Sequence, residues 1–254
     1  MIDLTGKVAL VTGGSRGIGR ATSLRLAQAG ADVVVNYVSS KTAAMEVAGQ
    51  IRQLGRRAWV VKADVSEEED AAAMIGFVQQ EIAQLDILIS NAATGGFHQL
   101  LDSKRKHFEH AISTNVLSVV YLVRAAQSLL VNKNYRTKVI ALSSHGSEMA
   151  LPMYGVVGTS KAALESLCRH LTLELGHLGV NINVVKAGLV KTDSTARLPD
   201  SERMFARRVD KAMMGSRTLE ASDVADVILF LASPLSDLIQ GQTITVDGGA
   251  EVHV

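Results

Sequence analysis

The sequence predicts one α/β domain built on a doubly wound, parallel sheet of seven strands. Short apolar runs alternate with helical patterns along all 254 residues, and this alternation is typical of parallel sheets covered by helices on both faces. At the start of the chain, an apolar run, a glycine-rich turn, a helical pattern and a second apolar run make a βαβ unit. No repeat, low-complexity tract or linker divides the sequence, so a single domain is expected.

The seven expected strands share one character. Each is a short, nearly continuous apolar run, as found when both faces of a strand are buried. They are expected at residues 7–12, 33–37, 58–62, 87–90, 138–143, 181–185 and 243–247.

Helical patterns fill the intervals between these strands. The first helix follows the glycine-rich turn and is stopped by Gly30, and the second is closed by Gly55. Ser66 and Glu69 have the spacing of a capping box for the third helix, and Ser222 is expected to cap the last one. The helices after the first are expected at residues 41–54, 66–84, 103–130, 154–177 and 222–232.

Bulk composition excludes several classes of protein. An apolar fraction of 47% supports a substantial core, and a net charge of +1 gives no overall field that would attract nucleic acid or a membrane surface. The single cysteine, Cys168, provides no disulfide framework or metal cluster and is expected to be buried. The N-terminus lacks a signal-peptide pattern and no apolar run could cross a bilayer, so a cytoplasmic protein is expected.

Residues 192–220 interrupt the alternation of strands and helices. The segment follows the sixth expected strand and mixes basic with apolar residues, among them Arg203, Met204, Phe205 and Arg208. A long insertion after the carboxyl end of a strand is where a lid over a ligand crevice is expected. We therefore predict a substrate lid; a pair of surface helices with a solvated basic face is the alternative.

The turn after the first strand carries Gly13, Gly17 and Gly19. Glycine lets backbone amides and the start of the next helix approach a pyrophosphate closely. A glycine-rich turn alone is weak evidence, but its place between the first buried strand and a helix predicts a dinucleotide site.

The end of the second strand indicates which dinucleotide is bound. An acidic residue there would bind the ribose 2′-hydroxyl of NAD, but residues 36–41 read Asn-Tyr-Val-Ser-Ser-Lys. Arg16 in the glycine-rich turn and Lys41 supply cations instead, which suits a ribose 2′-phosphate. NADPH is therefore the predicted cofactor; an Arg16 that only points to solvent is the alternative.

Tyr154 and Lys161 lie seven positions apart, in the helical pattern that follows Ser143 and Ser144. Seven residues correspond to roughly 700° of helical rotation and about 10 Å of rise, so both side chains are expected on one helix face. A phenol and an ammonium placed in this way could donate a proton and hold a cofactor. For this stretch taken alone, a surface helix with an incidental tyrosine and lysine is the alternative.

Together these motifs resemble the short-chain dehydrogenase/reductase superfamily, which has a Rossmann fold, over the whole chain. The matching positions are residues 12–19, Asp64, Val65, Asn91, Ala92, Ala93, Asn115, Ser144, Lys161 and residues 241–249.

The resemblance also implies roles for individual residues. Asp64 is expected to contact adenine, Asn91 to line the cofactor and Lys161 to hold the nicotinamide ribose. Asn115 is expected to support a water molecule in a proton relay. The residues expected to contact the cofactor are Gly13, Ser15, Arg16, Gly17, Ile18, Gly19, Tyr37, Ser39, Asp64, Val65, Asn91, Ala92, Ala93, Lys161, Gly188, Val190 and Thr192.

The position of the tyrosine departs from the family pattern Y-x-x-x-K. That pattern would place a tyrosine at position 157, where this chain has Val157, whereas Tyr154 lies one helical turn earlier. Ser144 keeps its usual spacing to the lysine. The displaced tyrosine, with Ala187-Gly188 in place of Pro-Gly, resembles the enoyl-acyl-carrier-protein reductases, most closely enoyl-acyl-carrier-protein reductase III (the FabL type). That type uses NADPH.

The displacement has a physical interpretation. A ketoreductase delivers hydride to the carbonyl carbon, and the adjacent oxygen gains the charge. An enoyl reductase delivers hydride to the β-carbon of a conjugated thioester, and the oxygen that gains charge is two bonds further away. Moving the phenol by one turn, about 4.5 Å, follows that oxygen. The chain is therefore predicted to reduce the trans-2 double bond of an enoyl thioester, in fatty-acid or related acyl-chain biosynthesis.

Tyr154 is expected to donate a hydrogen bond to the thioester oxygen. Ser144 could bind this carbonyl or only line the pocket. His98 and His145 could lie near the crevice and are assigned no role, and no metal site is expected. The predicted catalytic residues are Tyr154, Lys161, Ser144 and Asn115.

Two other functions fit parts of the pattern. A 3-oxoacyl-acyl-carrier-protein reductase, or another short-chain alcohol dehydrogenase, would use the same fold with an unusual tyrosine. A non-catalytic dinucleotide sensor would bind NADPH and reduce nothing. The expected carrier of the substrate is an acyl carrier protein or coenzyme A, and the resemblance implies a homotetramer.

Overall fold

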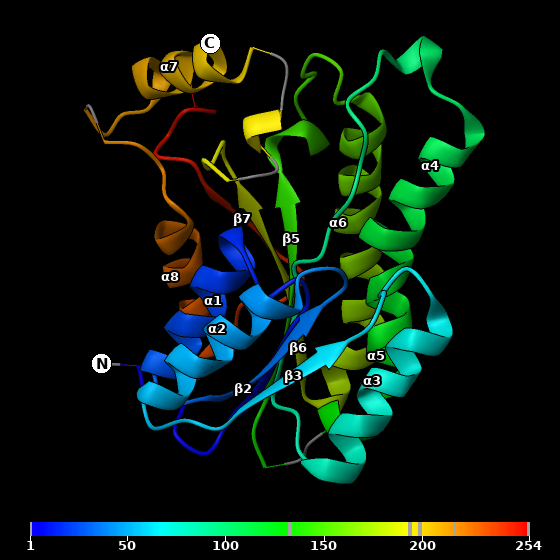
Figure 1. The fold of residues 1–254 in the computed structure, drawn as a ribbon, viewed down its shortest axis with the longest axis vertical. Helices are drawn as coiled ribbons and strands as arrows, with labels where there is room; N and C mark the ends of the chain where they lie inside the picture. Colours follow the sequence, from blue (N-terminus) through cyan, green and yellow to red (C-terminus); the bar gives the residue numbers. More distant parts are fainter. Residues whose placement is uncertain (1, 132–133, 193–194, 198–199, 216, 253–254) are drawn as a thin grey trace.

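A central sheet with helices on both faces forms the protein (Figure 1). The computed structural model describes residues 2–131, 134–192, 195–197, 200–215 and 217–252. All strand pairs are parallel, in the order β3-β2-β1-β4-β5-β6-β7. The predicted strands are confirmed, with ends that differ by at most two residues. They are β1 Val8–Val11, β2 Asp32–Tyr37, β3 Ala58–Lys62, β4 Ile87–Ser90, β5 Thr137–Ser144, β6 Val180–Ala187 and β7 Thr243–Val246.

The helices divide into two layers and one outlying element. Helices α1, α2 and α8 pack on one face of the sheet, and α3, α5 and α6 pack on the other. Helix α7 lies beyond the carboxyl ends of the strands (Figure 1). The helices are α1 Gly17–Gln28, α2 Lys41–Gln53, α3 Glu68–Glu81, α4 Arg105–Ile112, α5 Ser118–Leu130, α6 Gly155–Leu175, α7 Ser201–Lys211 and α8 Ala221–Ala232.

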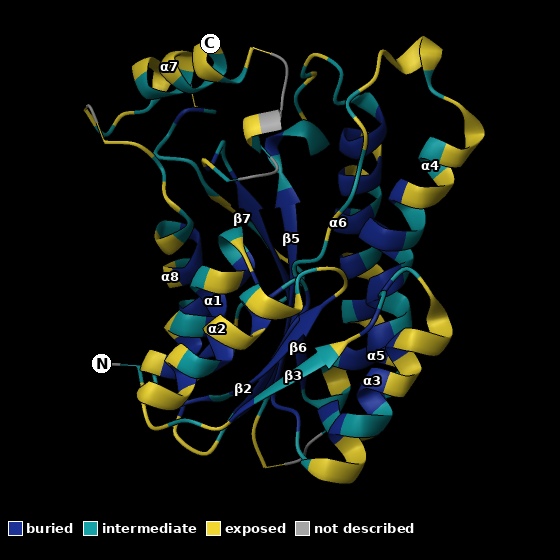
Figure 2. Ribbon diagram, viewed as in Figure 1, coloured by how far each residue is buried: buried dark blue, intermediate teal, exposed yellow. Residues whose placement is uncertain are grey.

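Strand β1 shows why the strands read as continuous apolar runs. Ala9 and Val11 belong to the core under α1, α2 and α8, whereas Val8 and Leu10 belong to the core under α3, α5 and α6. All four residues are at most 1% exposed. Both faces of the strand need apolar side chains, so the alternation of a one-sided strand is lost. Figure 2 shows the same burial along most of the sheet.

Two predicted helix caps are wrong. The Ser66 hydroxyl donates to Asp64 Oδ1 at 2.7 Å and binds back to the end of β3, and α3 begins only at Glu68. Helix α8 begins at Ala221, before Ser222, and its cap is formed by Glu220 and Asp223. The Asp223 carboxylate accepts from the Glu220 backbone amide at 2.9 Å. At α3 the Asp64 carboxylate engages the Ser66 hydroxyl, and the N-cap residue Glu67 makes no side-chain cap hydrogen bond. At α8 the Asp223 carboxylate takes the place expected for the serine, because an ionised acceptor forms the stronger hydrogen bond.

The expected helix at residues 103–130 is divided by a π-helical turn. The turn spans Ser113–Leu117 and joins α4 to α5. Asn115 lies in its middle. Single π-helical turns within α-helices occur frequently at functional sites.

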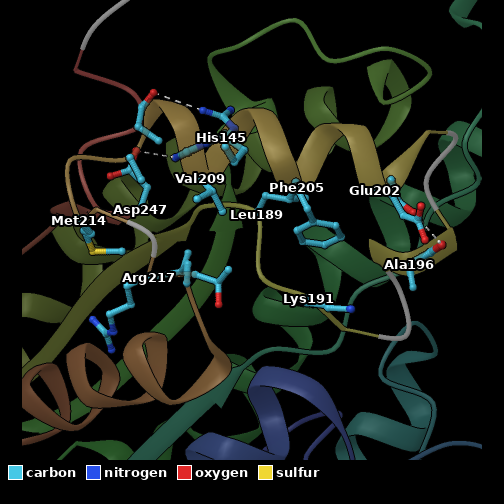
Figure 3. Close-up of a pocket in the computed structure, with 16 residues that line it drawn as sticks. His145, Leu189, Lys191, Ala196, Glu202, Phe205, Val209, Met214, Arg217 and Asp247 are labelled. Carbon is cyan, nitrogen blue, oxygen red and sulfur yellow. Dashed lines mark hydrogen bonds and ion pairs between the residues drawn. The ribbon is translucent and has the colours of Figure 1, made fainter.

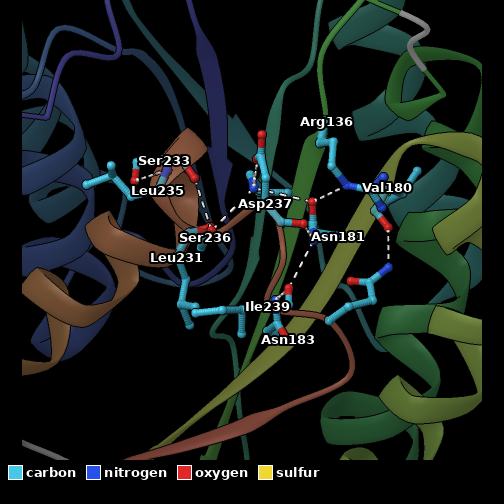
Figure 4. A network of polar contacts seen from close by, with 12 residues as sticks. Arg136, Val180, Asn181, Asn183, Leu231, Ser233, Leu235, Ser236, Asp237 and Ile239 are labelled. Carbon is cyan, nitrogen blue, oxygen red and sulfur yellow. Dashed lines mark hydrogen bonds and ion pairs between the residues drawn. The ribbon is translucent and has the colours of Figure 1, made fainter.

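A polar network closes the end of the sheet where β5 and β6 begin (Figure 4). The Lys138 ammonium group is buried and donates to Asn181 Oδ1 at 3.3 Å, Ser236 Oγ at 3.2 Å and Asp237 Oδ1 at 2.5 Å. The Asn181 amide in turn donates to the backbone carbonyls of Asp237 and Ile239. The three protons of the ammonium group therefore all have acceptors.

A helix that crosses a bilayer must be about 20 residues long and mainly apolar. None of the helices in the described part of the chain is both long and apolar enough to cross a membrane.

Candidate active site

A cavity of about 480 Å³ opens where the carboxyl ends of β1, β2, β4, β5 and β6 meet. In this strand order the chain goes from β1 to one side of the sheet and from β4 to the other, so the loops diverge and leave a crevice. We call this the first cavity. Almost all of the predicted site residues line it; Gly19 and Asn115 do not.

Glycines shape the turn between β1 and α1. Gly13 and Gly17 have φ angles of +59° and +53°, in the left-handed region that side chains disfavour. A Cβ atom at Gly19 would lie closer than 3.0 Å to the Gly13 carbonyl oxygen and to Asn91 Nδ2. The sequence therefore places α1 against the turn, with its N-terminal amides toward the cavity, where an anion is favoured.

The rim beside β2 bears hydroxyl and cationic groups. Tyr37 is buried, whereas Arg16 and Ser39 are exposed and line the cavity. Lys41 is exposed too but does not line it. Asp64 also lines this part, but its Oδ1 already accepts two hydrogen bonds from Ser66, from the amide and the hydroxyl.

Asn91 and Thr12 tie the two halves of the sheet together below the cavity. The Thr12 hydroxyl accepts from the backbone amides of Asn91 and Ala92, both at 3.0 Å. Asn91 Nδ2 donates to the carbonyls of Thr12 at 2.9 Å and Gly13 at 3.2 Å. These contacts hold the floor of the cavity rigid.

Tyr154 projects into the cavity from just before α6, not from within it. It is the N-cap residue of α6, with φ −102° and ψ 4°, so the expected helical geometry between Tyr154 and Lys161 is wrong. The two side chains nevertheless line the same cavity. The Tyr154 hydroxyl lies 3.0 Å from Ser144 Oγ, and its ring stacks on Phe97 with centroids 6.1 Å apart. Burial raises the pKa of the phenol, so Tyr154 is protonated at neutral pH.

Lys161 approaches the cavity from the first turns of α6. Its ammonium group is buried and donates to the Leu142 carbonyl of β5 at 2.6 Å. Burial lowers the pKa of Lys161 to about 8. An ammonium group has three protons, and this is the one hydrogen bond that it makes with the described residues. The remaining donors can serve a ligand.

Asn115 lies behind the wall of the cavity. Its side chain accepts from the Thr94 backbone amide and donates to the Thr94 carbonyl and to Ser160 Oγ, each at 2.9 Å. The amide group thus fastens the loop after β4 to α6. Its role in a proton relay stays a prediction.

Several cavity residues are missing from the sequence-based set. Thr94 Oγ1 lies 3.0 Å from His110 Nε2, and both line the cavity. Neither belongs to a motif, so only the fold brings them to the site. The other unpredicted lining residues are Val38, Ser40, Thr114, Leu142, Ser143, Ala187 and Thr195.

A second cavity of about 460 Å³ lies under α7 (Figure 3). Phe205 and Val209 of α7 face Leu189 across it, and Arg217 and Asp247 lie at one end. A small cavity of about 70 Å³ lies between the two larger ones, because its lining includes residues of both. Helix α7 has no buried residue, which is compatible with both the substrate lid and the solvated surface helix considered for residues 192–220, so the lid stays a prediction. Residues 193–194, 198–199 and 216 of that segment lie outside the described residues.

His145 forms a charged cluster at the edge of the second cavity. Its Nε2 lies 3.1 Å from Asp247 Oδ2 and 3.9 Å from Glu251 Oε2. Burial and the nearby Arg208 lower the pKa of the imidazole, which is therefore neutral at pH 7. Three such ligand atoms could in principle surround a cation, but Arg208 and Lys186 oppose one by charge.

The motifs and the geometry of the first cavity agree with a comparison to known families. A family model described as "Enoyl-(Acyl carrier protein) reductase" matches residues 13–251. The protein belongs to the short-chain dehydrogenase/reductase superfamily. It is an oxidoreductase of that superfamily, and its seven-stranded Rossmann fold is the one expected.

Three relatives illustrate the range of the superfamily. The chain is 34% identical over 247 residues to 1-cyclohexenylcarbonyl-CoA reductase of Streptomyces collinus, which covers 97% of this chain and 87% of that protein. It is 32% identical over 256 residues to versicolorin reductase 1 of Aspergillus parasiticus, covering 97% of each. A solved structure of a short chain dehydrogenase from Burkholderia cenocepacia in complex with NADP has a TM-score of 0.89 and 32% identity, and covers 98% of this chain and 99% of that one.

Proposed function

We propose that this short-chain dehydrogenase/reductase reduces the conjugated carbon–carbon double bond of a trans-2-enoyl thioester with NADPH, as an enoyl-acyl-carrier-protein reductase or a coenzyme A-dependent counterpart. One observation carries the proposal. Two described tyrosines, Tyr37 and Tyr154, line the first cavity, and Tyr154 is the one in the segment that carries Lys161, three residues before the family's usual position. Val157, at the usual position, packs on Gly95 and does not line the cavity.

The first cavity fits a dinucleotide bearing a 2′-phosphate. Gly17 and the start of α1 would hold the pyrophosphate, because Gly17 and Ile18 line the cavity at the N-terminus of that helix. The Gly13 amide already donates to Asn36 Oδ1 at 3.1 Å, so Gly13 would contribute close approach and not a donor. Arg16 and Ser39 would hold the 2′-phosphate, since residues 36–41 at the end of β2 include no carboxylate and Asp64 Oδ1 already accepts two hydrogen bonds from Ser66. The Burkholderia cenocepacia relative was solved with NADP. When bound, NADPH supplies the hydride.

Tyr154 is the group that meets the charge formed on the substrate. Reduction at the β-carbon leaves negative charge on the thioester oxygen, and a protonated phenol can donate a hydrogen bond to it. With Ser144 donating to the phenol oxygen, the phenol proton is free to point at the substrate. A well-placed donor of this kind contributes about 3 kcal/mol to the transition state.

Lys161 and Ser144 support this donor. The free protons of the Lys161 ammonium group would bind the nicotinamide ribose, and its charge raises the potential around the phenol. Ser144 orients the phenol from the end of β5. Asn115 holds the loop that closes the cavity above them.

The second cavity would receive the acyl part of the thioester. Its apolar lining includes Leu189, Phe205 and Val209, and the small cavity beside Tyr154 leads to it. The basic residues of α7 suit an acidic carrier protein or the phosphates of coenzyme A. The Streptomyces collinus relative is named for a conjugated coenzyme A thioester, which supports this substrate class. We further propose a homotetramer, which sedimentation analysis can test.

The test follows NADPH oxidation with crotonyl-CoA and acetoacetyl-CoA in parallel. We expect faster turnover of crotonyl-CoA, and a loss of about 10²-fold in kcat in Tyr154→Phe. Arg16→Ala should raise the KM for NADPH at least tenfold and change the KM for NADH little, because only NADPH has the 2′-phosphate. Faster turnover of acetoacetyl-CoA would refute the proposal.

Reduction of a carbonyl group is the second candidate. Ser144 and Lys161 keep the family spacing used by ketoreductases, and one relative is named versicolorin reductase 1. The same pair of substrates separates the two. If neither is reduced while NADPH binds tightly, a non-catalytic dinucleotide sensor becomes the better interpretation.

A further inference from the structure

The Tyr154 ring lies against a glycine that no sequence motif singles out. Gly146 belongs to the short 3₁₀ turn His145–Ser147, directly after Ser144. A Cβ atom at Gly146 would lie closer than 3.0 Å to both Cδ1 and Cε1 of the Tyr154 ring. Real Cβ atoms do not approach other atoms so closely, so the ring occupies the place that a side chain at 146 would need.

A second glycine brings the turn and α6 together. A Cβ atom at Gly158 would lie closer than 3.0 Å to the Gly146 carbonyl oxygen. The Gly158 amide also donates to the Tyr154 carbonyl at 2.7 Å, which fixes the first turn of α6 under the tyrosine. The ring is therefore seated between the 3₁₀ turn and the start of the helix.

Position 157, where the family usually has its tyrosine, is occupied by Val157, and a different glycine makes room for that side chain. A Cβ atom at Gly95 would lie closer than 3.0 Å to Val157 Cγ2, so Val157 packs directly on the glycine of the loop after β4. Val157 is 6% exposed. One glycine thus makes room for the tyrosine before the helix, and another makes room for the valine that replaces the family's tyrosine.

We propose that Gly146 is a positioning residue that sets where the Tyr154 phenol lies, and hence which bond of the substrate is reduced. The effect on the substrate rests on the proposed function, whereas the placement of the ring does not. The backbone of Gly146 is not in the left-handed region, so alanine is compatible with it. The Tyr154 ring is the main obstacle to a side chain at this position.

The size of the effect follows from the contact. A carbon–carbon contact needs about 3.5 Å, so Gly146→Ala must displace the ring by at least about 0.5 Å. The phenol then moves relative to Ser144, to which it is now hydrogen-bonded at 3.0 Å. Misplacement on the order of 1 Å can reduce a rate about 10²-fold.

The experiment compares Gly146→Ala with Gly76→Ala, both in the full-length enzyme. Gly76 is in α3, and a Cβ atom there meets nothing within 4 Å, so Gly76→Ala should raise the melting temperature slightly. Gly146→Ala should lower kcat for crotonyl-CoA by about tenfold to a hundredfold, with the Kd for NADPH changed less than twofold. Gly76→Ala should change neither value.

A structural readout separates the placement of the ring from the chemistry. In protein labelled with ¹³C-tyrosine, Tyr154 is one of four tyrosines and is assigned by its loss in Tyr154→Phe. Gly146→Ala should shift the Tyr154 resonance most strongly. In the otherwise wild-type protein, Gly146→Ala should lower the melting temperature, because the new Cβ atom clashes with the Tyr154 ring. In a Tyr154→Ala background the ring is absent, so Gly146→Ala should not lower the melting temperature.

The outcomes are distinct. A shifted Tyr154 resonance and a melting-temperature loss that disappears with the ring support the placement, even if crotonyl-CoA is not a substrate and the proposed function fails. If crotonyl-CoA is reduced, and Gly146→Ala leaves kcat and the resonance unchanged, the positioning role is overturned. An equal melting-temperature loss in both backgrounds also overturns it.

Discussion

Lys138 in β5 and Lys161 in α6 are both buried but differ in how many hydrogen-bond acceptors their ammonium groups have. Lys138, near the start of the strand, has three acceptors, including the carboxylate of Asp237. Lys161 lies against Leu142 near the strand's other end and bonds one backbone carbonyl. Burial lowers the pKa of both, and the hydrogen-bonded Asp237 carboxylate partly opposes this lowering for Lys138. At the start of β5 the Lys138 ammonium group is fully hydrogen-bonded and stabilises the fold. Near the other end of the strand the Lys161 ammonium group keeps unused protons that a ligand can bind.

The difference between the two lysines shows that the free protein tolerates an incompletely hydrogen-bonded buried charge at Lys161, whereas the charge at Lys138 is fully hydrogen-bonded. A buried charge with unused donors is unfavourable in the free protein. It persists where binding will satisfy it, which is typical of active sites. The two lysines therefore allow function and stability to be tested separately at the two ends of β5.

The largest effect should come from Lys161→Met. Loss of the ammonium group would remove the proposed contact with the nicotinamide ribose and the positive potential near Tyr154, so kcat/KM should fall by about 10²–10³-fold. The variant should be at least as stable as the wild type, because an incompletely paired buried charge has been removed. Rates and urea unfolding measure both. If Lys161→Met unfolded at a lower urea concentration but kept its activity, Lys161 would stabilise the fold and would not serve the reaction.

The pH dependence of kcat/KM in the wild-type enzyme should reflect the titration of Lys161. Since Lys161 must be charged to act, kcat/KM should fall above a pKa of about 8, tenfold per pH unit. The folded pKa lies below the unfolded value of about 10.4, so the unfolded chain binds more protons between these values. The contribution of Lys161 to stability therefore rises with pH from about 8 to 10.4. Lys161→Met should lack both effects.

At the other end of β5, Lys138→Met should affect stability and leave activity within twofold of the wild type. The substitution leaves Asp237 without its partner, but the Asp237 side chain is 42% exposed and water can replace the lysine. A loss of about 2 kcal/mol in unfolding free energy is therefore expected, less than for a fully buried pair. If Lys138→Met lost activity but kept its unfolding free energy, the stabilising role assigned to Lys138 would be contradicted.

The smallest effect is expected for Ser236→Ala. The serine hydroxyl is one of three acceptors for Lys138 and also donates to the carbonyls of Leu231 and Ser233. Its removal leaves Asp237 and Asn181 in place, so about 1 kcal/mol of stability should be lost. Urea unfolding of Lys138→Met, Ser236→Ala and the double variant would show non-additive losses if the network is shared.

The sequence was sufficient to predict the sheet and most of the site. Parallel strands buried on both faces leave continuous apolar runs, as in β1, and these were found within two residues of their true ends. Glycines 13, 17 and 19 identified the phosphate turn, because the need for glycine there is local to the chain.

Features that depend on distant parts of the chain were missed. Helical periodicity placed Tyr154 within α6, whereas packing against Gly146 leaves it just before the helix. Thr94 and His110 come together only because the loop after β4 meets α4. The Glu220–Asp223 cap prevailed over Ser222 because a carboxylate was available nearby.

The contact between Glu251 and His145 has a practical consequence for anyone producing the enzyme. Glu251 Oε2 lies 3.9 Å from His145 Nε2, and the last described residues run beside α7, whereas the first described residues lie near α1 and α2 at the far side (Figure 1). A purification tag fused shortly after Glu251 would lie beside the second cavity, where the proposed function places the acyl part of the substrate. Tags, surface tethers and fluorescent fusions therefore belong at the amino end.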